Sequence, residues 1–392
     1  MTDGPMRPAS NRPAPLILVA TPSASDEAPP SGSYASVARE GQALLAAELS
    51  NRLSRLGAAV SPLPTAAPPT GEAFHWGRWF AAGARLAIEE AQRDGRQLDA
   101  VGYAGSGAVA LLDDDGLATL LAPARGEAVA NNRFSADAFV VAGEPHQLER
   151  ALSALDACPS DNAAPRCLDA AGFGVRDLGA APFARFDVDT PLDLALLRLA
   201  GRVPGTRTPE ASVARFLETA RLRGDRALEV PHLDEIGSVM RERDAELVVA
   251  GRVPASTWAH LETETACRVR CFIEERGMRS APSGRPRSLL AALLRRSSPA
   301  ELVGELTALG DAVICDSRVI MAAIAGSPDA HLWPPEEERF ASDLGDAPRV
   351  ATPWLHELVA AAAASPVPVL LGGHALVSDG LRLIVAAAWH GR

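Results

Sequence analysis

Several features are missing from this sequence, and each absence excludes a class of protein. No stretch approaches the roughly eighteen consecutive apolar residues of a membrane-spanning helix, and residues 1–15 contain no apolar leader segment. The five cysteines are an odd number without a C-x-x-C pair, which fits neither a disulfide framework nor a zinc site. We therefore expect a cytoplasmic protein with no membrane partner.

A basic surplus is also missing, as are the short motifs of several enzyme classes. The 38 basic residues are outnumbered by 49 acidic ones, and the formal net charge is −11. Nonspecific nucleic-acid binders need a concentrated basic surface, so no nucleic-acid partner is predicted. The motifs G-x-S-x-G, H-E-x-x-H and GK[ST] do not occur, which argues against serine hydrolases, zinc proteases and P-loop proteins. The oligomeric state stays open.

What is present is a chain of 392 residues, long enough for two domains with cores of their own. Short apolar runs such as PLILVA alternate with segments of helical periodicity in both halves. This alternation predicts an α/β fold with a mainly parallel sheet in three layers, followed by a second, smaller α/β domain. The predicted parts are a flexible tail (1–14), a first domain (15–203), a helical connector (204–230) and a second domain (231–392).

The string FDVDTPLDL at residues 186–194 is the most informative motif. Thr190 and Pro191 predict the start of a helix, because threonine caps the first turn and proline has no amide to lose there. Asp187 and Asp189 alternate with apolar residues as in a strand, so both carboxylates are expected on one face. Two carboxylates at a strand end are suitable ligands for Mg²⁺, and the pair is a predicted metal site.

FDVDTPLDL resembles the D-x-D-T-P-x-D-L string of the MobA-like nucleotidyltransferases, above all the 2-phospholactate guanylyltransferases. The stretch VGYAGSGAVALLDDDGLATLL is similar in layout to that family's G-G-D-x-P-L-L-T loop, so the resemblance covers about residues 98–200. It implies a nucleotidyltransferase-like fold and Mg²⁺-dependent transfer of a nucleoside monophosphate to a small phosphorylated acceptor. It also implies that Asp187 or Asp189 faces the metal ion or the phosphates, and that Asp193 fixes the helix.

Two departures from the family pattern bear on catalysis. PLILVATPSASDEAPP carries no Lys or Arg, whereas the family has a basic, glycine-rich phosphate loop at this place. Gly105, Ser106 and Gly107 stand near the position of the family's central metal-binding aspartate, where they would let a ligand approach the backbone. Either the metal is held differently, or the domain is a degraded binding protein for a nucleotide or sugar phosphate.

A polar group, Asn131, Asn132 and Arg133, lies between two apolar runs of the first domain. Arginine can hold a phosphate with two parallel hydrogen bonds, and asparagine can contact a base or sugar edge. These residues are therefore candidate nucleotide contacts. A polar turn capped by asparagine side chains explains them equally well.

Polar residues also follow the predicted strands of the second domain. Arg252 follows ELVVAG, Glu274 follows RVRCFI, Asp316 and Arg318 follow DAVIC, and His374 follows VPVLLGG. Ligands of parallel α/β sheets bind beyond the carboxyl ends of the strands, so these side chains are expected in one cleft. His374 would be a general acid or base, Asp316 or Glu274 would orient it or bind a cation, and Arg252 and Arg318 would bind an anion. Helix caps and ion pairs are the structural alternative.

The basic segment RGMRSAPSGRPRS, residues 276–288, precedes two predicted helices between Arg287 and Leu309. It is either a wrap around an anionic ligand or a plain loop. The predicted ligand is, in all these interpretations, a nucleotide or another phosphorylated small molecule. An enzyme whose chemistry lies in the second domain stays an alternative to nucleotidyl transfer.

Overall fold

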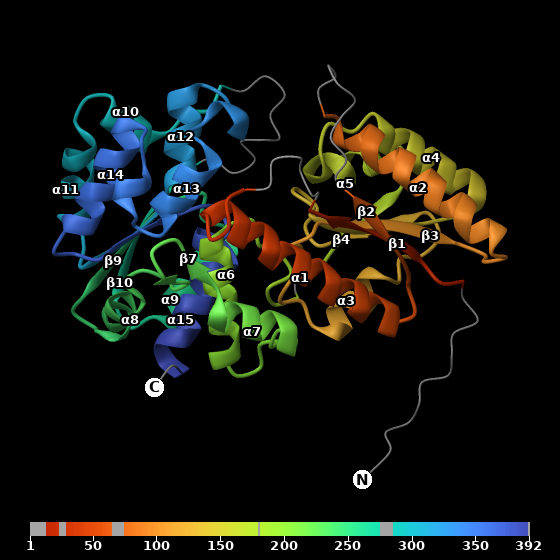
Figure 1. The fold of residues 1–392 in the computed structure, drawn as a ribbon, viewed down its shortest axis with the longest axis horizontal. Helices are drawn as coiled ribbons and strands as arrows, with labels where there is room; N and C mark the ends of the chain where they lie inside the picture. The colour runs from red at the N-terminus through yellow and green to blue at the C-terminus, as the bar shows by residue number, and fades with distance from the viewer. Residues whose placement is uncertain (1–12, 23–28, 65–73, 179–180, 275–284, 391–392) are drawn as a thin grey trace, which may run out of the picture. The chain divides into compact units, whose positions relative to one another are not determined.

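The structure is a computed structural model that describes residues 13–22, 29–64, 74–178, 181–274 and 285–390 (Figure 1). The predicted flexible tail lies almost wholly outside these residues. The predicted fold class is confirmed: the protein is mixed α/β, with one mostly parallel and one parallel sheet. None of the described helices combines the length and the apolar character that a membrane crossing requires.

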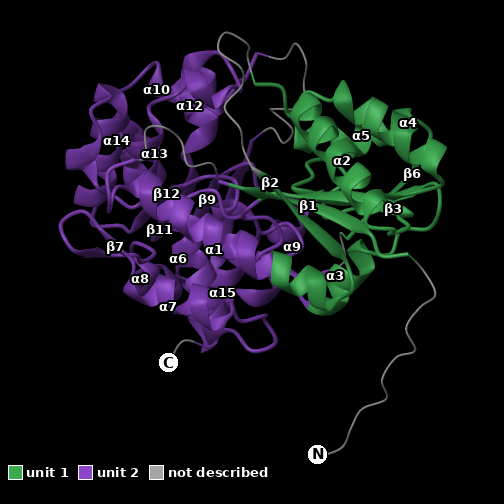
Figure 2. Cartoon of the chain, turned by 45° about the vertical axis from the view of Figure 1, so that its right-hand side comes forward, with its two compact units in different colours: residues 1–21, 50–105, 114–178 green, residues 22–49, 106–113, 179–392 purple. Residues whose placement is uncertain are grey.

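The chain divides into two compact units, and neither is continuous in sequence (Figure 2). The first consists of residues 1–21, 50–105 and 114–178, and the second of residues 22–49, 106–113 and 179–392. Helix α1 (Tyr34–Arg55) begins in the second unit and ends in the first. Residues 179–203, which the sequence assigns to the first domain, are grouped here with the second sheet.

The first unit is built on a six-stranded sheet in the order β2-β1-β3-β5-β4-β6. Strand β5 runs antiparallel to both neighbours, and the other pairings are parallel. The central strands are continuous apolar runs, as strands covered on both faces require. The bounds are β1 (Leu16–Thr21), β2 (Ala59–Pro64), β3 (Ala100–Ala104), β4 (Glu127–Ala130), β5 (Ala138–Ala142) and β6 (Gly174–Asp177).

Three helices of the first unit lie together over one face of this sheet (Figure 2). They are α2 (Trp76–Arg93), α4 (Pro145–Asp156) and α5 (Ala164–Ala170), and the short α3 (Asp114–Leu120) follows the third strand. Trp76 and Phe80 of α2 stack at 5.3 Å between ring centroids, and both contact Tyr103 edge-on. Trp76 and Phe80 are therefore core residues of the first unit.

The second unit contains a four-stranded sheet whose strands are all parallel, in the order β10-β9-β11-β12. These are the four strands predicted for the second domain: β9 (Glu246–Gly251), β10 (Arg268–Ile273), β11 (Ala312–Asp316) and β12 (Val369–Gly372). The chain runs from β9 outward to β10 and then back to β11 on the other side of β9. The direction of the strand order thus reverses between β9 and β11, and ligands of such sheets bind beyond the carboxyl ends at this reversal.

Helices cover both faces of the second sheet (Figure 1). One face carries α8 (Leu233–Arg241), α9 (Ala255–Glu264) and α15 (Leu381–His390). The other carries α10 (Leu289–Leu294), α11 (Pro299–Thr307), α12 (Ser317–Ala325), α13 (Glu336–Asp343) and α14 (Pro353–Ala364). The unit also includes α6 (Pro191–Leu199), α7 (Ala211–Thr219) and the hairpin of β7 (Arg221–Leu222) and β8 (Arg226–Ala227).

Candidate functional site

The strand expected at residues 186–189 is not formed, which corrects the reasoning that aligned Asp187 with Asp189. The segment is irregular, and its Val188 amide donates a hydrogen bond to the Gly107 carbonyl at 3.2 Å. Burial alternates all the same: Phe186 and Val188 are buried, whereas Asp187 is half-buried and Asp189 exposed. The alternation of burial thus comes from the packing of Phe186 and Val188 and needs no sheet.

Helix α6 begins as predicted, with Thr190 as its cap and Pro191 in its first turn. The Asp193 Oδ2 atom accepts hydrogen bonds from the Asp189 amide at 3.1 Å, the Thr190 amide at 2.9 Å and the Thr190 hydroxyl at 2.9 Å. Asp193 therefore fixes the start of the helix, as the resemblance implies. Its complete burial, together with the nearby Asp189 carboxylate, raises the pKa of Asp193 to about 7.

The turn at residues 106–107 packs against the same segment. A Cβ on Gly107 would lie 2.2 Å from the Val188 carbonyl oxygen, so this close approach requires glycine. The Gln42 side-chain amide donates to that oxygen at 3.0 Å. Gly107 thus packs against the residue between the two acids, and Ser106 precedes it in the second unit. Gly105 belongs to the first unit, where its amide donates to the Asp137 carbonyl at 2.8 Å.

A buried ion pair occupies the reversal point between β9 and β11. Arg252 donates from Nε to Asp316 Oδ2 at 2.6 Å and from Nη2 to Oδ1 at 3.0 Å. Gly251, at the end of β9, has φ +131°, and a Cβ there would lie 2.3 Å from the Cβ of Asp316, so glycine is needed for this approach. Burial alone would raise the pKa of Asp316, but Arg252, His374 and Arg318 outweigh it, and the pKa is lowered. Asp316 is therefore an ionised partner of Arg252.

Arg318 connects this pair to the motif of α6. Its amide donates to Asp316 Oδ1 at 3.1 Å, and its guanidinium donates to both oxygens of the buried Asp343, with Nη1 2.9 Å from Oδ1. Burial would lower the pKa of Arg318, but Asp343, Asp316 and Asp193 together raise it. The sequence assigned the α6 motif to the first domain and the Arg252–Asp316 pair to the second. Both belong to one charged network in the second unit.

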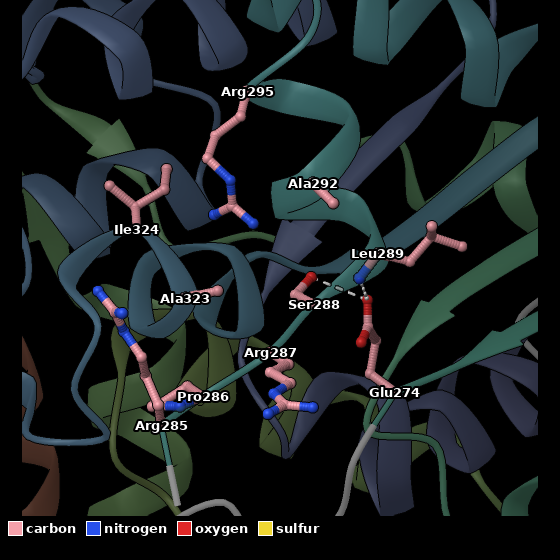
Figure 3. A pocket seen from close by; sticks show the side chains of 10 residues that line it. All are labelled: Glu274, Arg285, Pro286, Arg287, Ser288, Leu289, Ala292, Arg295, Ala323 and Ile324. Carbon is pink, nitrogen blue, oxygen red and sulfur yellow. Dashed lines mark hydrogen bonds between the residues drawn. The ribbon is translucent and has the colours of Figure 1, made fainter.

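Glu274 follows β10 and caps helix α10 (Figure 3). Its Oε1 atom accepts from the Ser288 hydroxyl at 2.8 Å and from the amides of Leu289 and Leu290 at 3.1 and 3.4 Å. Its amide donates to the Gly251 carbonyl at 2.8 Å, beside the Arg252–Asp316 pair. These contacts are those of the structural alternative, a helix cap.

Glu274 also borders a pocket of about 720 Å³ in the second unit (Figure 3). Arg285 and Arg287, from the segment before α10, and Arg295, at the end of that helix, line it with exposed side chains. With the residues that the structure describes, none of the three guanidinium groups forms an ion pair or a side-chain hydrogen bond. Of these, Arg285 and Arg287 belong to the basic segment noted in the sequence. Arg295 was missed, because one arginine at a helix end carries no distinctive pattern.

The polar group of the first unit forms a turn between β4 and β5. Asn131 Oδ1 accepts from the amides of Asp137 and Ala138 at 2.9 and 3.1 Å, and Asn132 Oδ1 accepts from the Phe134 amide at 3.2 Å. Arg133 Nη2 lies 3.7 Å from the Asp169 carboxylate. These are the contacts of the turn alternative, and nucleotide binding by Asn131, Asn132 and Arg133 stays a prediction.

Asp187 and Asp189 were predicted as metal ligands, and His374 as a general acid or base. Throughout the described ranges, three or more His, Cys, Asp or Glu side chains do not gather closely enough to share a metal ion. Mg²⁺ keeps several waters and needs only one or two carboxylates, so Asp187 and Asp189 stay candidate ligands. Half-buried His374 lies close enough to Asp316 to lower the pKa of that carboxyl. Its role with Asp316 and Glu274 stays a prediction, because both acids already hold protein partners.

No protein-family model matches this sequence, and comparison with curated proteins finds no match. The fold and the site geometry therefore carry the functional argument. Two places in the second unit offer chemistry: the arginine pocket beside β10, and the acids of residues 187–189 beside the turn at residue 107.

Proposed function

We propose that the second unit binds a phosphorylated small molecule in the pocket lined by Arg285, Arg287 and Arg295. The observation that carries this proposal is the meeting of three exposed guanidinium groups without described acidic partners in a chain whose net charge is −11. A phosphate monoester carries close to two negative charges near neutral pH. Arginine holds phosphate oxygens with two parallel hydrogen bonds. Three arginines therefore suit a phosphate monoester better than a ligand that carries a single carboxylate.

The place of the pocket supports the same proposal. Glu274 directly follows β10, so the pocket lies at the carboxyl edge of a parallel sheet, where α/β proteins bind ligands. Among the described residues that line the pocket, Glu274 is the one acid, and one of its oxygens is occupied by the cap of α10. The chain contains no lysine, so arginine must supply every strong cationic contact to a phosphate.

Isothermal titration calorimetry with inorganic phosphate and pyrophosphate tests this proposal. We expect saturable binding that weakens as salt rises and is lost in the double variant Arg285→Gln, Arg287→Gln. Arg296→Gln is the matched control, because Arg296 is an exposed neighbour of Arg295 that does not line the pocket. Absence of binding to the wild-type protein, or equal binding by the double variant, would refute the proposal.

A second candidate function is Mg²⁺-dependent nucleotidyl transfer. The observation that favours it is the contact between Gly107 and Val188, which brings Asp187 and Asp189 beside the turn that the family resemblance pairs with them. A nucleotidyl transferase needs a divalent ion to organise the phosphates and to neutralise charge in the transition state. Asp187 and Asp189 would hold that ion.

Pyrophosphate release from each of the four nucleoside triphosphates, with Mg²⁺ and a panel of phosphorylated acceptors, tests the second candidate. We expect release with one triphosphate, and loss of release in Asp187→Asn and Asp189→Asn. No release and no thermal shift with any triphosphate would overturn nucleotidyl transfer. Binding without turnover, unchanged in Asp187→Asn, would instead indicate a binding protein that has lost catalysis.

A further inference from the structure

The pocket of the three arginines has an apolar wall. Leu289 of α10 and Ile324 of α12 line it with 61% and 40% of their surface exposed. Pro286, Ala292 and Ala323 complete the wall. Contiguous exposed apolar surface bordered by polar groups is typical of ligand-binding sites.

The wall is aliphatic throughout. Among the described residues that line the pocket, there is no aromatic ring on which a base could stack and no Asn or Gln to contact a base edge. Leu293, one helical turn after Leu289 on α10, is also 40% exposed and extends the apolar strip beyond the pocket. A saturated chain fits this lining better than a nucleobase does.

We infer that the ligand of this pocket is a phosphate monoester of an aliphatic alcohol. Its phosphate contacts Arg285, Arg287 and Arg295, and its hydrocarbon chain lies along Leu289 and Ile324. The inference rests on the proposed phosphate-binding function and adds the second half of the ligand. Burial of each further methylene tightens binding about fourfold, until the chain exceeds the wall.

Calorimetry with inorganic phosphate and with methyl, butyl, hexyl and octyl phosphate, each below its micelle concentration, tests the inference. We expect affinity to rise with chain length, and adenosine monophosphate to bind more weakly than hexyl phosphate. In the double variant Leu289→Ser, Ile324→Ser the rise is lost, while binding of inorganic phosphate is kept. Leu332→Ser is the control, because Leu332 is 64% exposed and does not line the pocket.

The outcomes separate this inference from the proposed function. If inorganic phosphate binds and all alkyl phosphates bind equally, the aliphatic ligand is refuted and the phosphate site stands. If adenosine monophosphate binds more tightly than octyl phosphate, the aliphatic ligand is again refuted. If no phosphate compound binds, both proposals fail. The exposed positions of the serine substitutions keep the variant folded, which circular dichroism checks.

Two cysteines of the first unit are in contact with each other. Cys158, after the end of α4, and Cys167, on α5, share a hydrogen bond with their sulfur atoms 2.9 Å apart. Cys158 is buried and Cys167 half-buried. The Cys158 thiol lowers the pKa of Cys167 to about 7, whereas that hydrogen bond and burial raise the pKa of Cys158. Cys167 is thus the more reactive of the two at neutral pH.

We propose that Cys158 and Cys167 are a reversible dithiol site for low-molecular-weight disulfides. The Cys167 thiolate attacks one sulfur of the disulfide, forms a mixed disulfide and releases one thiolate. Cys158 then loses its proton and attacks the Cys167 sulfur, which forms the internal disulfide and releases the second thiolate. One external disulfide is reduced to two thiols, and two protein thiols are oxidised.

Mass spectrometry after treatment with oxidised glutathione tests this second proposal. Arg166 lies between the two cysteines, so trypsin places them on separate peptides that only the disulfide joins. After unfolding and alkylation, we expect this joined pair, with Cys267, Cys271 and Cys315 alkylated as internal controls. A Cys158→Ser variant should keep glutathione on Cys167. Two alkylated cysteines at 158 and 167, or persistent glutathione on wild-type Cys167, would refute the proposal.

Discussion

Replacing Asp193 by Asn should remove a pH dependence from the stability of the second unit. Asp193 is completely buried and faces Asp189, Asp343 and Arg318. Its pKa is raised from 3.8 to about 7, so the folded chain holds a proton that the unfolded chain releases near pH 3.8. The contribution of this carboxyl to stability is therefore fully present below pH 3.8 and is lost as pH rises to about 7.

The size of this effect follows from the two pKa values. Each pH unit between them corresponds to about 1.4 kcal/mol, so the wild type should lose about 4 kcal/mol of stability relative to Asp193→Asn. Asparagine keeps an oxygen that accepts the hydrogen bonds of the helix start but cannot ionise. The loss should be complete by about pH 8.

Urea unfolding followed by tryptophan fluorescence at several values between pH 4 and pH 8 measures this difference. The fluorescence mainly reports the second unit, because four of the six tryptophans lie there: Trp258, Trp333, Trp354 and Trp389. Asp244→Asn, which changes an exposed acid of the same unit, is the control. If the free energies of unfolding of wild type and Asp193→Asn stay parallel across this pH range, the argument for a buried, protonated Asp193 is wrong.

The fold class and most elements could be predicted from the sequence, because continuous apolar runs mark strands covered on both faces. Strands β9, β11 and β12 were predicted on this basis, whereas the run RVRCFI of β10 alternates charged with apolar residues, as suits a half-exposed edge strand. All four strands form one parallel sheet. Strand β2 was missed, because AVSPLP contains Pro62 and Pro64. It lies at the edge of its sheet, where the missing amide hydrogen of proline is tolerated.

The assembly of the site could be predicted only in part. Rules for strand ends placed Arg252, Asp316 and His374 at one edge of a sheet, and the structure brings them together there. Periodicity shows which face of a helix is apolar, but it does not show which sheet that face packs on. In α6 nearly every residue is buried. Leu192 of this helix packs on Gly372 of β12, where a Cβ would lie 2.9 Å from the Leu192 side chain. The motif therefore joins the second sheet, although it follows the first in sequence.

The same urea assay checks three further substitutions. Thr190→Ala removes the cap of α6 and should cost about 1 kcal/mol, and a cost near zero would contradict that role. Gly251→Ala should lower the free energy of unfolding by about 3 kcal/mol or more, since its Cβ would collide with Asp316. Gly304→Ala, in open space on α11, should instead raise that free energy by about 1 kcal/mol. Asp343→Ala should cost about 3–5 kcal/mol, because it leaves the buried Arg318 guanidinium without its bidentate partner. The double change Arg318→Met, Asp343→Leu should recover most of this loss, since the cost comes from an unpaired buried charge. A double variant as unstable as Asp343→Ala would show instead that the pair is needed for packing.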